Sequence, residues 1–200
     1  MEKKVKKILF SEVLVDATTT QKIAIIAIMT ALCVVENMLE FFKFADTQFS
    51  LTILFSAFAG YLIGPIFGGV ASFLGDLVGF LYNSGGQPYY PWIGITMAVI
   101  AIISGLILNG IENKSKVSIF IKTAIVSILT FLIGTVGINT TAFWLVFGGE
   151  TPYFVYLFTR LFAKWQILNS IINYALLFIA LPTFIKIKEQ ILKLRKNKTC

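Results

Sequence analysis

The chain of 200 residues is 57% hydrophobic and 14% charged, with a mean hydropathy of +0.84 and a formal net charge of +7. Soluble globular proteins carry about 25% charged residues, so this composition excludes water as the main solvent and indicates an integral membrane protein. The sequence has no His, and its only cysteines are Cys33 and Cys200, which excludes a zinc cluster or a disulfide framework; we expect no metal and no cofactor.

Six apolar runs are read as membrane-spanning helices, because roughly 20 apolar residues are needed to cross the hydrocarbon layer as a helix. In chain order they are 23–42, 49–63, 66–82, 92–108, 119–147 and a last run that starts near Tyr156 and continues past Pro182. The second run is the shortest and ends at the turn formed by Gly64 and Pro65. The connections are short, so we predict one domain over 1–200, an all-α bundle of six transmembrane helices.

Basic residues gather in three clusters, in the N-terminal segment 1–20, around the start of the fifth run, and in the tail 186–200. With six spans all three clusters fall on one side, and the positive-inside rule makes that side cytoplasmic. We therefore predict a multi-pass protein of a bacterial plasma membrane with both termini in the cytoplasm. The positive charge is then explained by orientation and by contact with anionic lipid, rather than by nucleic-acid binding.

Polar and ionisable residues interrupt the apolar runs in the half of the membrane opposite the basic clusters. Such residues are costly to place in a membrane, so each marks a candidate site. In chain order they are Glu36, Glu40, Asp76, Asn139, Thr140, Thr141, Arg160 and Lys164. Their convergence predicts a binding pocket open to the outside, with a few polar groups that orient a ligand.

The basic pair, Arg160 and Lys164, also allows a purely structural interpretation. In that interpretation the two side chains form ion pairs with Glu36 or Glu40, or extend to the outer headgroups. Asp76 is harder to explain in this way, because a carboxylate at that depth needs a cationic or donor-rich partner, and a ligand would supply one.

A second set of polar residues follows on the same run, namely Gln166, Asn169 and Asn173. On an unbroken helix of 3.6 residues per turn these amides lie about half a revolution away from the basic pair. Both sets cannot face one pocket without a break in the helix. The sequence leaves open which of them does.

The loop 83–91 is flexible at its glycines and aromatic at its end, where Tyr89 and Tyr90 precede Pro91. Such a loop would serve as a lid over a planar ligand. The alternative is that Tyr89, Tyr90 and Trp92 form an aromatic belt at the membrane interface.

Catalytic function is not indicated, and we predict no catalytic residues. A nucleophile needs a base, and with no His the remaining lysines and carboxylates show no convincing arrangement. No nucleotide-binding motif is present either, so a transport function would need energy from a partner or from an ion gradient.

Two stretches of the sequence resemble the substrate-binding S components of energy-coupling factor (ECF) vitamin transporters. They are the glycine-rich run 59–69 with Leu74-Gly75-Asp76-Leu77-Val78-Gly79 and Tyr90-Pro91, and the later Gly137-Ile138-Asn139-Thr140 with Trp144 and Thr159-Arg160-Leu161. The second set is similar to the folate branch. The resemblance extends over most of the chain, from about Ile23 to Phe178.

The resemblance implies a function and a set of partners. Ala27 and Ala31 match the family's alanine motif on the first helix, which docks against the transmembrane T subunit, and two ATPase subunits then drive the complex. The pocket of the outer half would be lined by Asp76, Asn139 and Trp144, together with Arg160. We expect folate as the ligand, with Tyr89, Tyr90 and Lys164 as further binding residues.

Other ligands stay open, because the chain departs from the folate pattern at residues 91–96 and at Asn169-Ser170. The alternatives are pantothenate, pyridoxine, thiamine, riboflavin, cobalamin or a precursor with a planar ring. A structural membrane subunit without a ligand is the alternative from a different class of function.

Overall fold

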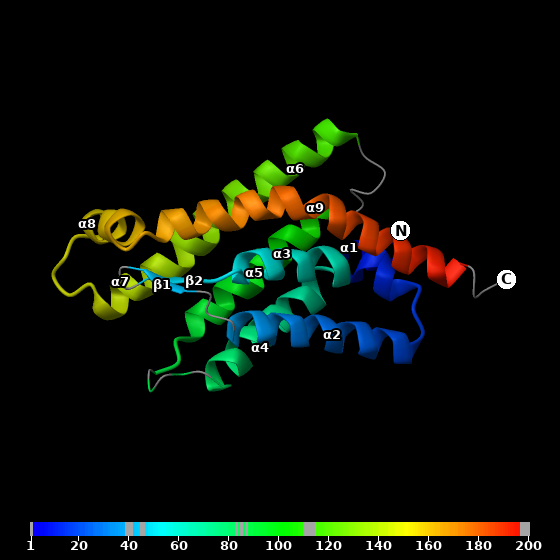
Figure 1. Ribbon diagram of the computed structural model, residues 1–200, viewed down its shortest axis with the longest axis horizontal. Helices are drawn as coiled ribbons and strands as arrows, with labels where there is room; N and C mark the ends of the chain where they lie inside the picture. The colour runs from blue at the N-terminus through cyan, green and yellow to red at the C-terminus, as the bar shows by residue number, and fades with distance from the viewer. Residues whose placement is uncertain are drawn as a thin grey trace.

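The computed structural model describes residues 2–38, 42–44, 47–82, 84, 86, 88–109 and 115–196 (Figure 1). Its elements in chain order are α1 (Glu2–Val15), α2 (Thr19–Met38), β1 (Phe42–Phe44), β2 (Thr47–Phe49), α3 (Thr52–Ile63), α4 (Pro65–Tyr82), α5 (Pro91–Leu108), α6 (Lys116–Leu129), the π-helix η1 (Thr130–Thr140), α7 (Thr141–Phe147), α8 (Tyr153–Phe158), the π-helix η2 (Thr159–Ala163) and α9 (Gln166–Lys196). The two short strands pair antiparallel, with Phe42 opposite Phe49. All the other described elements are helices.

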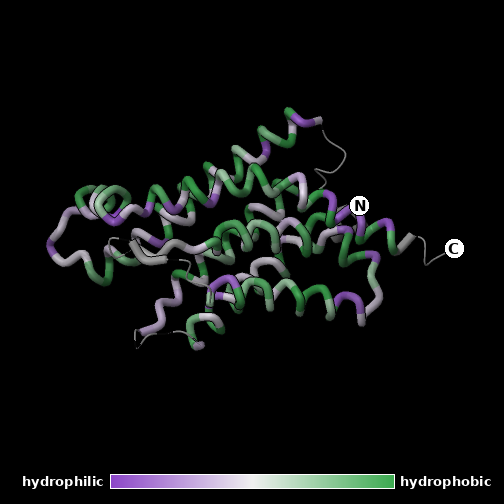
Figure 2. The backbone as a smooth tube through the Cα atoms, in the orientation of Figure 1, coloured by the Kyte–Doolittle hydropathy of each residue, from purple (hydrophilic) through white to green (hydrophobic). Residues whose placement is uncertain are grey.

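Five helical segments of the described residues are long and apolar enough to cross a membrane. They are Thr19–Met38, Pro65–Tyr82, Pro91–Leu108, Lys116–Phe147 and Gln166–Leu194. Apolar residues predominate along their middle parts (Figure 2). The chain is therefore an all-α membrane protein, as predicted, whereas the count of six spans stays a prediction because α3 has only 12 residues.

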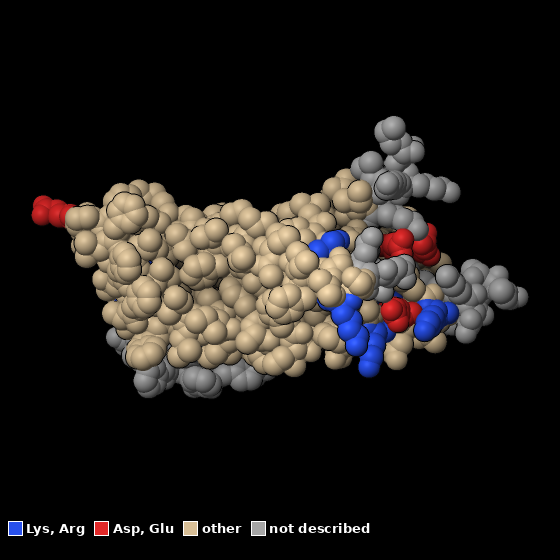
Figure 3. Space-filling model, turned by 90° about the horizontal axis from the view of Figure 1, so that it is seen from above, with Lys and Arg blue, Asp and Glu red and all other residues tan. Residues whose placement is uncertain are grey.

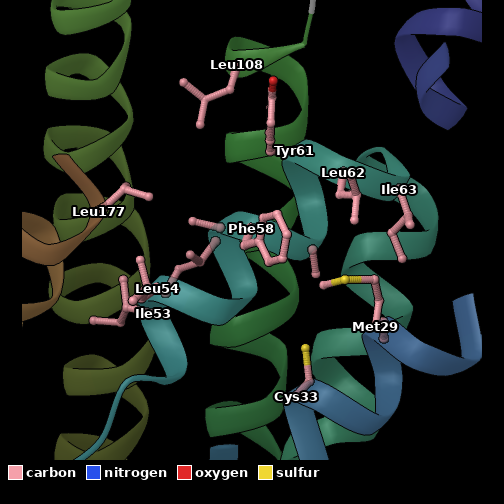
Figure 4. Close-up of a cluster of buried hydrophobic side chains, with 14 of the residues drawn as sticks. Met29, Cys33, Ile53, Leu54, Phe58, Tyr61, Leu62, Ile63, Leu108 and Leu177 are labelled. Atoms are coloured by element: carbon pink, nitrogen blue, oxygen red, sulfur yellow. The ribbon is translucent and has the colours of Figure 1, made fainter. Parts of the chain in front are cut away.

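Helix α3 lies at the centre of the bundle, where ten of its 12 residues are buried. Its sequence is apolar on all sides, which is the pattern of a helix enclosed by others. Phe58 and Tyr61 point into the core shared with Leu108 and Leu177 (Figure 4). A short helix is tolerated here because protein, rather than lipid, surrounds it.

Glycines allow α3, α4 and α5 to pack at backbone distance. A Cβ added at Gly68 on α4 would lie 2.6 Å from the Cα of Gly60 on α3, and one added at Gly105 on α5 would lie 2.7 Å from the Gly60 carbonyl oxygen. The recurrence of small residues in this part of the sequence is therefore a packing feature.

The N-terminal helix α1 packs against this core, although the sequence predicts only a basic cytoplasmic segment there. Ser11, Val13 and Leu14 are fully buried. Ser11 has a positive φ of 57°, which kinks the helix. The kinked part of α1 packs against the turn between α3 and α4. Gly64 in that turn has a φ of +88°, and a Cβ there would lie 2.7 Å from the carbonyl carbon of Phe10.

Both ends of the chain lie at the same end of the bundle (Figure 1). On the face drawn in Figure 3, the Lys and Arg side chains gather at that end as well. This arrangement agrees with the basic side inferred from the sequence. Assignment of that side to the cytoplasm stays a prediction.

The prediction of a sixth span that starts near Tyr156 is wrong at its N-terminal end. The helical segment Tyr153–Ala163 is separate, and α9 begins only at Gln166. In Figure 1 α8 is seen nearly end-on, whereas α9 runs along the long axis, so the two are steeply inclined to each other. The membrane-spanning part of this region is α9.

Candidate functional site

A cavity of about 370 Å³ lies among α2, α3, α4, α5, η1, α7, η2 and α9. Its lining residues are Asn37, Ser50, Thr52, Ile53, Asp76, Gly79, Phe80, Ile93, Thr96, Met97, Ile100, Thr135, Asn139, Phe143, Arg160, Lys164, Gln166 and Asn169. The volume falls in the usual range for small-molecule sites, and the lining combines apolar walls with a few polar groups, as such sites do. Four of the predicted site residues, Asp76, Asn139, Arg160 and Lys164, are among them.

Asp76 is held by two donors from outside its own helix. Asn37 Nδ2 on α2 donates to Oδ1 over 3.2 Å, and the Tyr89 hydroxyl donates to Oδ2 over 3.0 Å. The side chain is 6% exposed. Gly94 on α5 makes room for this group, because a Cβ there would lie 2.7 Å from the Tyr89 hydroxyl oxygen. The result is a carboxylate fixed in the cavity wall.

Tyr89 belongs to the loop between α4 and α5, outside the membrane-spanning helices. Burial raises the pKa of its phenol, and the charge of Asp76 raises it further. Tyr89 therefore keeps its proton at neutral pH and remains a hydrogen-bond donor. The predicted loop residue thus contacts the predicted carboxylate directly.

Arg160 points its guanidinium at the face of Phe143, with Cζ 4.0 Å from the ring centroid. A cation over an aromatic face is stabilised by the ring quadrupole. The Nε atom is buried and makes no hydrogen bond, and Tyr156 interacts with the head of the side chain. Within the described ranges no acidic side chain forms an ion pair with Arg160; Glu40, one of the proposed partners, lies outside them.

A break in the helix brings residues of both polar sets of the sixth run to one cavity. After η2 the chain turns at Lys164 (φ −94°, ψ 14°), and Trp165 then adopts a positive φ of 53°. Helix α9 starts afresh, with the amides of Leu168 and Asn169 bonded to the Trp165 carbonyl. Lys164 and Asn169 therefore line the same space, together with Arg160 and Gln166, which answers the question that the sequence left open.

Asn173, the third amide of that set, does not line the cavity. Its Nδ2 donates to the Ser50 carbonyl over 2.8 Å, and its Oδ1 accepts from the Leu54 amide over 3.3 Å. The side chain thus ties α9 to the start of α3, where backbone groups would otherwise lack partners. Its function in the fold is structural.

Asn139 lies on η1 and is 9% exposed. Its Oδ1 is buried without a hydrogen-bond partner in the described structure. A buried acceptor without a donor is costly, so its position in the cavity wall suits a ligand that brings an N–H or O–H group. Inserted π-turns of this kind occur often at functional sites.

Tyr90 and Trp144 lie outside the lining of the cavity. Tyr90 stacks on Trp92 at 5.0 Å between ring centroids and meets Phe143 edge-on at 5.4 Å. The indole of Trp144 donates to the Thr151 carbonyl over 2.8 Å and packs edge-on against Tyr153. Tyr90 therefore packs against the lining residue Phe143, whereas the partners of Trp144 do not line the cavity.

Ala27 and Ala31 are exposed on the outer face of α2. The opposite face of this helix buries Met29, Cys33 and Glu36 in the bundle. The two alanines are one turn apart, so they form a shallow strip on which another helix can approach closely.

The sequence did not predict several of the lining residues, including Asn37, Thr96, Thr135 and Phe143. Asn37 follows Glu36 in the outer part of the first span, so an intramembrane amide beside an acid was the available signal. Thr96 and Thr135 carry no such signal, since a Thr within a span usually satisfies its hydroxyl on its own helix. Thr96 does so here, by donating to the Trp92 carbonyl over 2.8 Å.

Comparison with known proteins assigns the chain to a family. A search of curated proteins finds no match. The sequence model of a family described as "ECF transporter, substrate-specific component" matches residues 21–189, which include every residue of the cavity lining. This match covers most of the chain and agrees with the multi-pass fold. The chain belongs to the family of substrate-specific components of ECF transporters.

Proposed function

We propose that this subunit binds a water-soluble vitamin, with folate as the first candidate, at the outer side of a bacterial plasma membrane. The observation that carries the proposal is one cavity whose wall includes both a fixed carboxylate, Asp76, and the basic residues Arg160 and Lys164. A ligand that suits this wall has hydrogen-bond donors on one part and an anionic group on another. Folate has both.

The chemistry of folate agrees with the individual groups. The amino-pterin edge presents N–H donors, which Asp76 would accept in charge-assisted hydrogen bonds, the stronger kind in proteins. The glutamate carboxylate would meet Arg160 or Lys164. Phe80 and Phe143 supply aromatic wall for the planar rings, and Asn139 offers its unused acceptor.

Transport would require an energy source outside this chain, since the sequence has no nucleotide-binding motif. We propose that the strip at Ala27 and Ala31 docks against the T subunit of an ECF module, and that two ATPase subunits supply the energy. The exposed position of both alanines on α2 supports this assignment.

Tryptophan fluorescence of the purified protein in nanodiscs tests the ligand. Trp92 and Trp165 directly flank the lining residues Ile93 and Gln166, so occupancy of the cavity should change their emission. We expect saturable quenching by folate. If another vitamin quenches instead, the proposed transport function stands and that vitamin takes the place of folate as the ligand. The vitamins to be compared are pantothenate, pyridoxine, thiamine, riboflavin and cobalamin. Silence from the whole panel would overturn the function and favour a structural subunit.

A pair of matched variants tests the site. Asp76→Asn keeps the shape but removes the charge, and we expect folate affinity to fall by more than about tenfold, the effect of one charge-assisted hydrogen bond. Glu150→Gln removes a carboxylate from the exposed loop after α7 and should leave affinity unchanged. Equal affinities for Asp76→Asn and the parent protein would remove Asp76 from the site.

A further inference from the structure

Glu36 is a buried acid that the proposed ligand site does not use. It lies on the inner face of α2 and is 3% exposed. Neither carboxylate oxygen has a hydrogen-bond partner among the described residues. The cavity lining includes its neighbour Asn37 but not Glu36 itself. A carboxyl in this position needs an explanation, because buried polar groups in proteins are almost always hydrogen-bonded.

The surroundings of Glu36 form a tight seam between α2 and α4. A Cβ added at Gly75 on α4 would overlap Cys33, and one added at Gly79 would lie 2.6 Å from the Cβ of Asn37. The hydroxyl of Ser72 is buried in the same seam beside the Cys33 thiol and makes no hydrogen bond of normal geometry. The seam therefore holds two polar groups that nothing in the described structure satisfies.

Among the residues whose side chains the structure describes, the titratable groups that face Glu36 can be named element by element; residues 39–49 are not among them. Cys33 lies one turn before it on α2, and Asp76 faces it from α4. Tyr61 is the one titratable residue in the sequence of α3, and its ring packs against Lys188 instead. From the segment before α3 only the Leu51 backbone N–H acts on the carboxyl, without a hydrogen bond of normal geometry. No cation is among these groups.

Glu36 and Asp76 are thus a carboxyl pair in very different environments. Asp76 has a donor on each oxygen, which favours its charged form, whereas Glu36 has none. Ionising both would place two like charges in one low-dielectric seam, which is costly. We propose that Glu36 is a proton-binding site, and that the pair holds one proton, on Glu36, while Asp76 carries the charge.

The proposal also accounts for the second unsatisfied group. A protonated carboxyl is a donor, and the seam offers the Ser72 hydroxyl oxygen as an unused acceptor. If Asp76 accepts N–H groups of a ligand, part of its charge is neutralised, and the cost of ionising Glu36 falls. This coupling between binding and proton release rests on the proposed function, whereas the proton on Glu36 of the empty protein does not.

Infrared spectroscopy of the ligand-free protein in nanodiscs tests the proton directly. A protonated carboxyl gives a C=O stretching band well separated from those of carboxylates and amides. We expect this band at neutral pH in the parent protein, and a downward shift of the band when glutamate, but not aspartate, is labelled with carbon-13. The labelling requires no substitution, so it does not depend on whether a variant folds.

Variants then assign the band to one residue. Glu36→Gln, which keeps the size of the side chain, should abolish it, whereas Glu150→Gln should leave it in place. A parent protein without the band, a band that shifts with labelled aspartate, or a band that persists in Glu36→Gln would each overturn the proposal. Because no ligand is present, failure of folate to bind would not alter these results.

Discussion

The hydroxyl of Tyr89 donates to Oδ2 of Asp76 over 3.0 Å, so the loop before α5 is attached to the wall of the cavity by a charged group. We expect Tyr89→Phe to weaken folate binding by about tenfold, since it removes one hydrogen bond to a carboxylate and leaves the ring in place. Isothermal titration calorimetry measures the change. Tyr82→Phe is the control, because Tyr82 is 76% exposed, and its affinity should equal that of the parent protein.

Arg160→Gln tests the part of the cavity that would bind an anion. The substitution removes the planar cation that lies over Phe143, and we expect folate affinity to fall by about tenfold or more. A neutral pterin without a carboxylate should bind the variant and the parent protein equally well in competition titrations. An equal loss for both compounds would show that Arg160 supports the fold rather than the anionic group.

The break at Trp165 should tolerate glycine but not proline. Glycine adopts a φ of +53° readily, so Trp165→Gly should keep folate affinity within about threefold. Proline is fixed near φ −65° and removes the Trp165 amide, which donates to the Phe162 carbonyl over 3.2 Å. Trp165→Pro should therefore lower affinity by more than about tenfold, because Lys164 and Gln166 lose their common orientation. Similar calorimetric titrations for the two variants would argue against the break as an organiser of the site.

A bulky residue on the alanine strip should separate binding from transport. Ala27→Trp or Ala31→Trp keeps the cavity intact but prevents close approach of a partner helix, so uptake of labelled folate should be abolished while affinity is unchanged. Uptake is measured in cells that also express an ECF module. Val70→Trp places the same bulk on an exposed position of α4 and should leave uptake intact. Loss of ligand binding in the alanine variants would refute the docking function.

Gly64 and Gly86 form a matched pair that tests the packing of α1. Both have a positive φ, of +88° and +79°, but only Gly64 has backbone atoms where a Cβ would lie. Gly86→Ala should cost about 1–2 kcal/mol, from conformation alone. Gly64→Ala should cost about 1–3 kcal/mol more, because φ 88° with ψ 167° is a conformation essentially restricted to glycine and because α1 has to shift. Thermal unfolding in detergent compares the two variants; equal midpoints would mean that neither the conformation at Gly64 nor its contact with α1 resists a side chain.

The sequence identifies part of the cavity because charge inside an apolar run is unusual. Asp76, Asn139, Arg160 and Lys164 are found in this way, and all four line the cavity. The shared position of Lys164 and Gln166 could not be predicted, because it depends on a positive φ at Trp165. Glycine or asparagine would have marked such a site, whereas a bulky aromatic residue gives no signal.

The fold, like the cavity, was predictable from the sequence only in part. Long apolar runs predict the membrane-spanning helices, with the boundary of the last one displaced by the break before Gln166. The sequence placed Asn173 on a polar face, whereas its side chain is hydrogen-bonded to backbone groups of Ser50 and Leu54 at the start of α3. This could not be predicted, because the two partners are more than a hundred residues away in sequence. Helix α1 was missed because lysines dominate its first half and its buried residues, Val13 and Leu14, form too short a run.

The burial of α1 also has a practical meaning for the boundaries of the protein. The family match begins at residue 21, yet Val13 and Leu14 are completely enclosed and the Asn109 side chain donates to the Ile8 carbonyl. A chain trimmed to the matched region would lose α1 and expose the apolar surface that it covers on α3, α4 and α5. The folded unit is therefore longer than the stretch by which its family is recognised, and its first helix should be kept in any purified form.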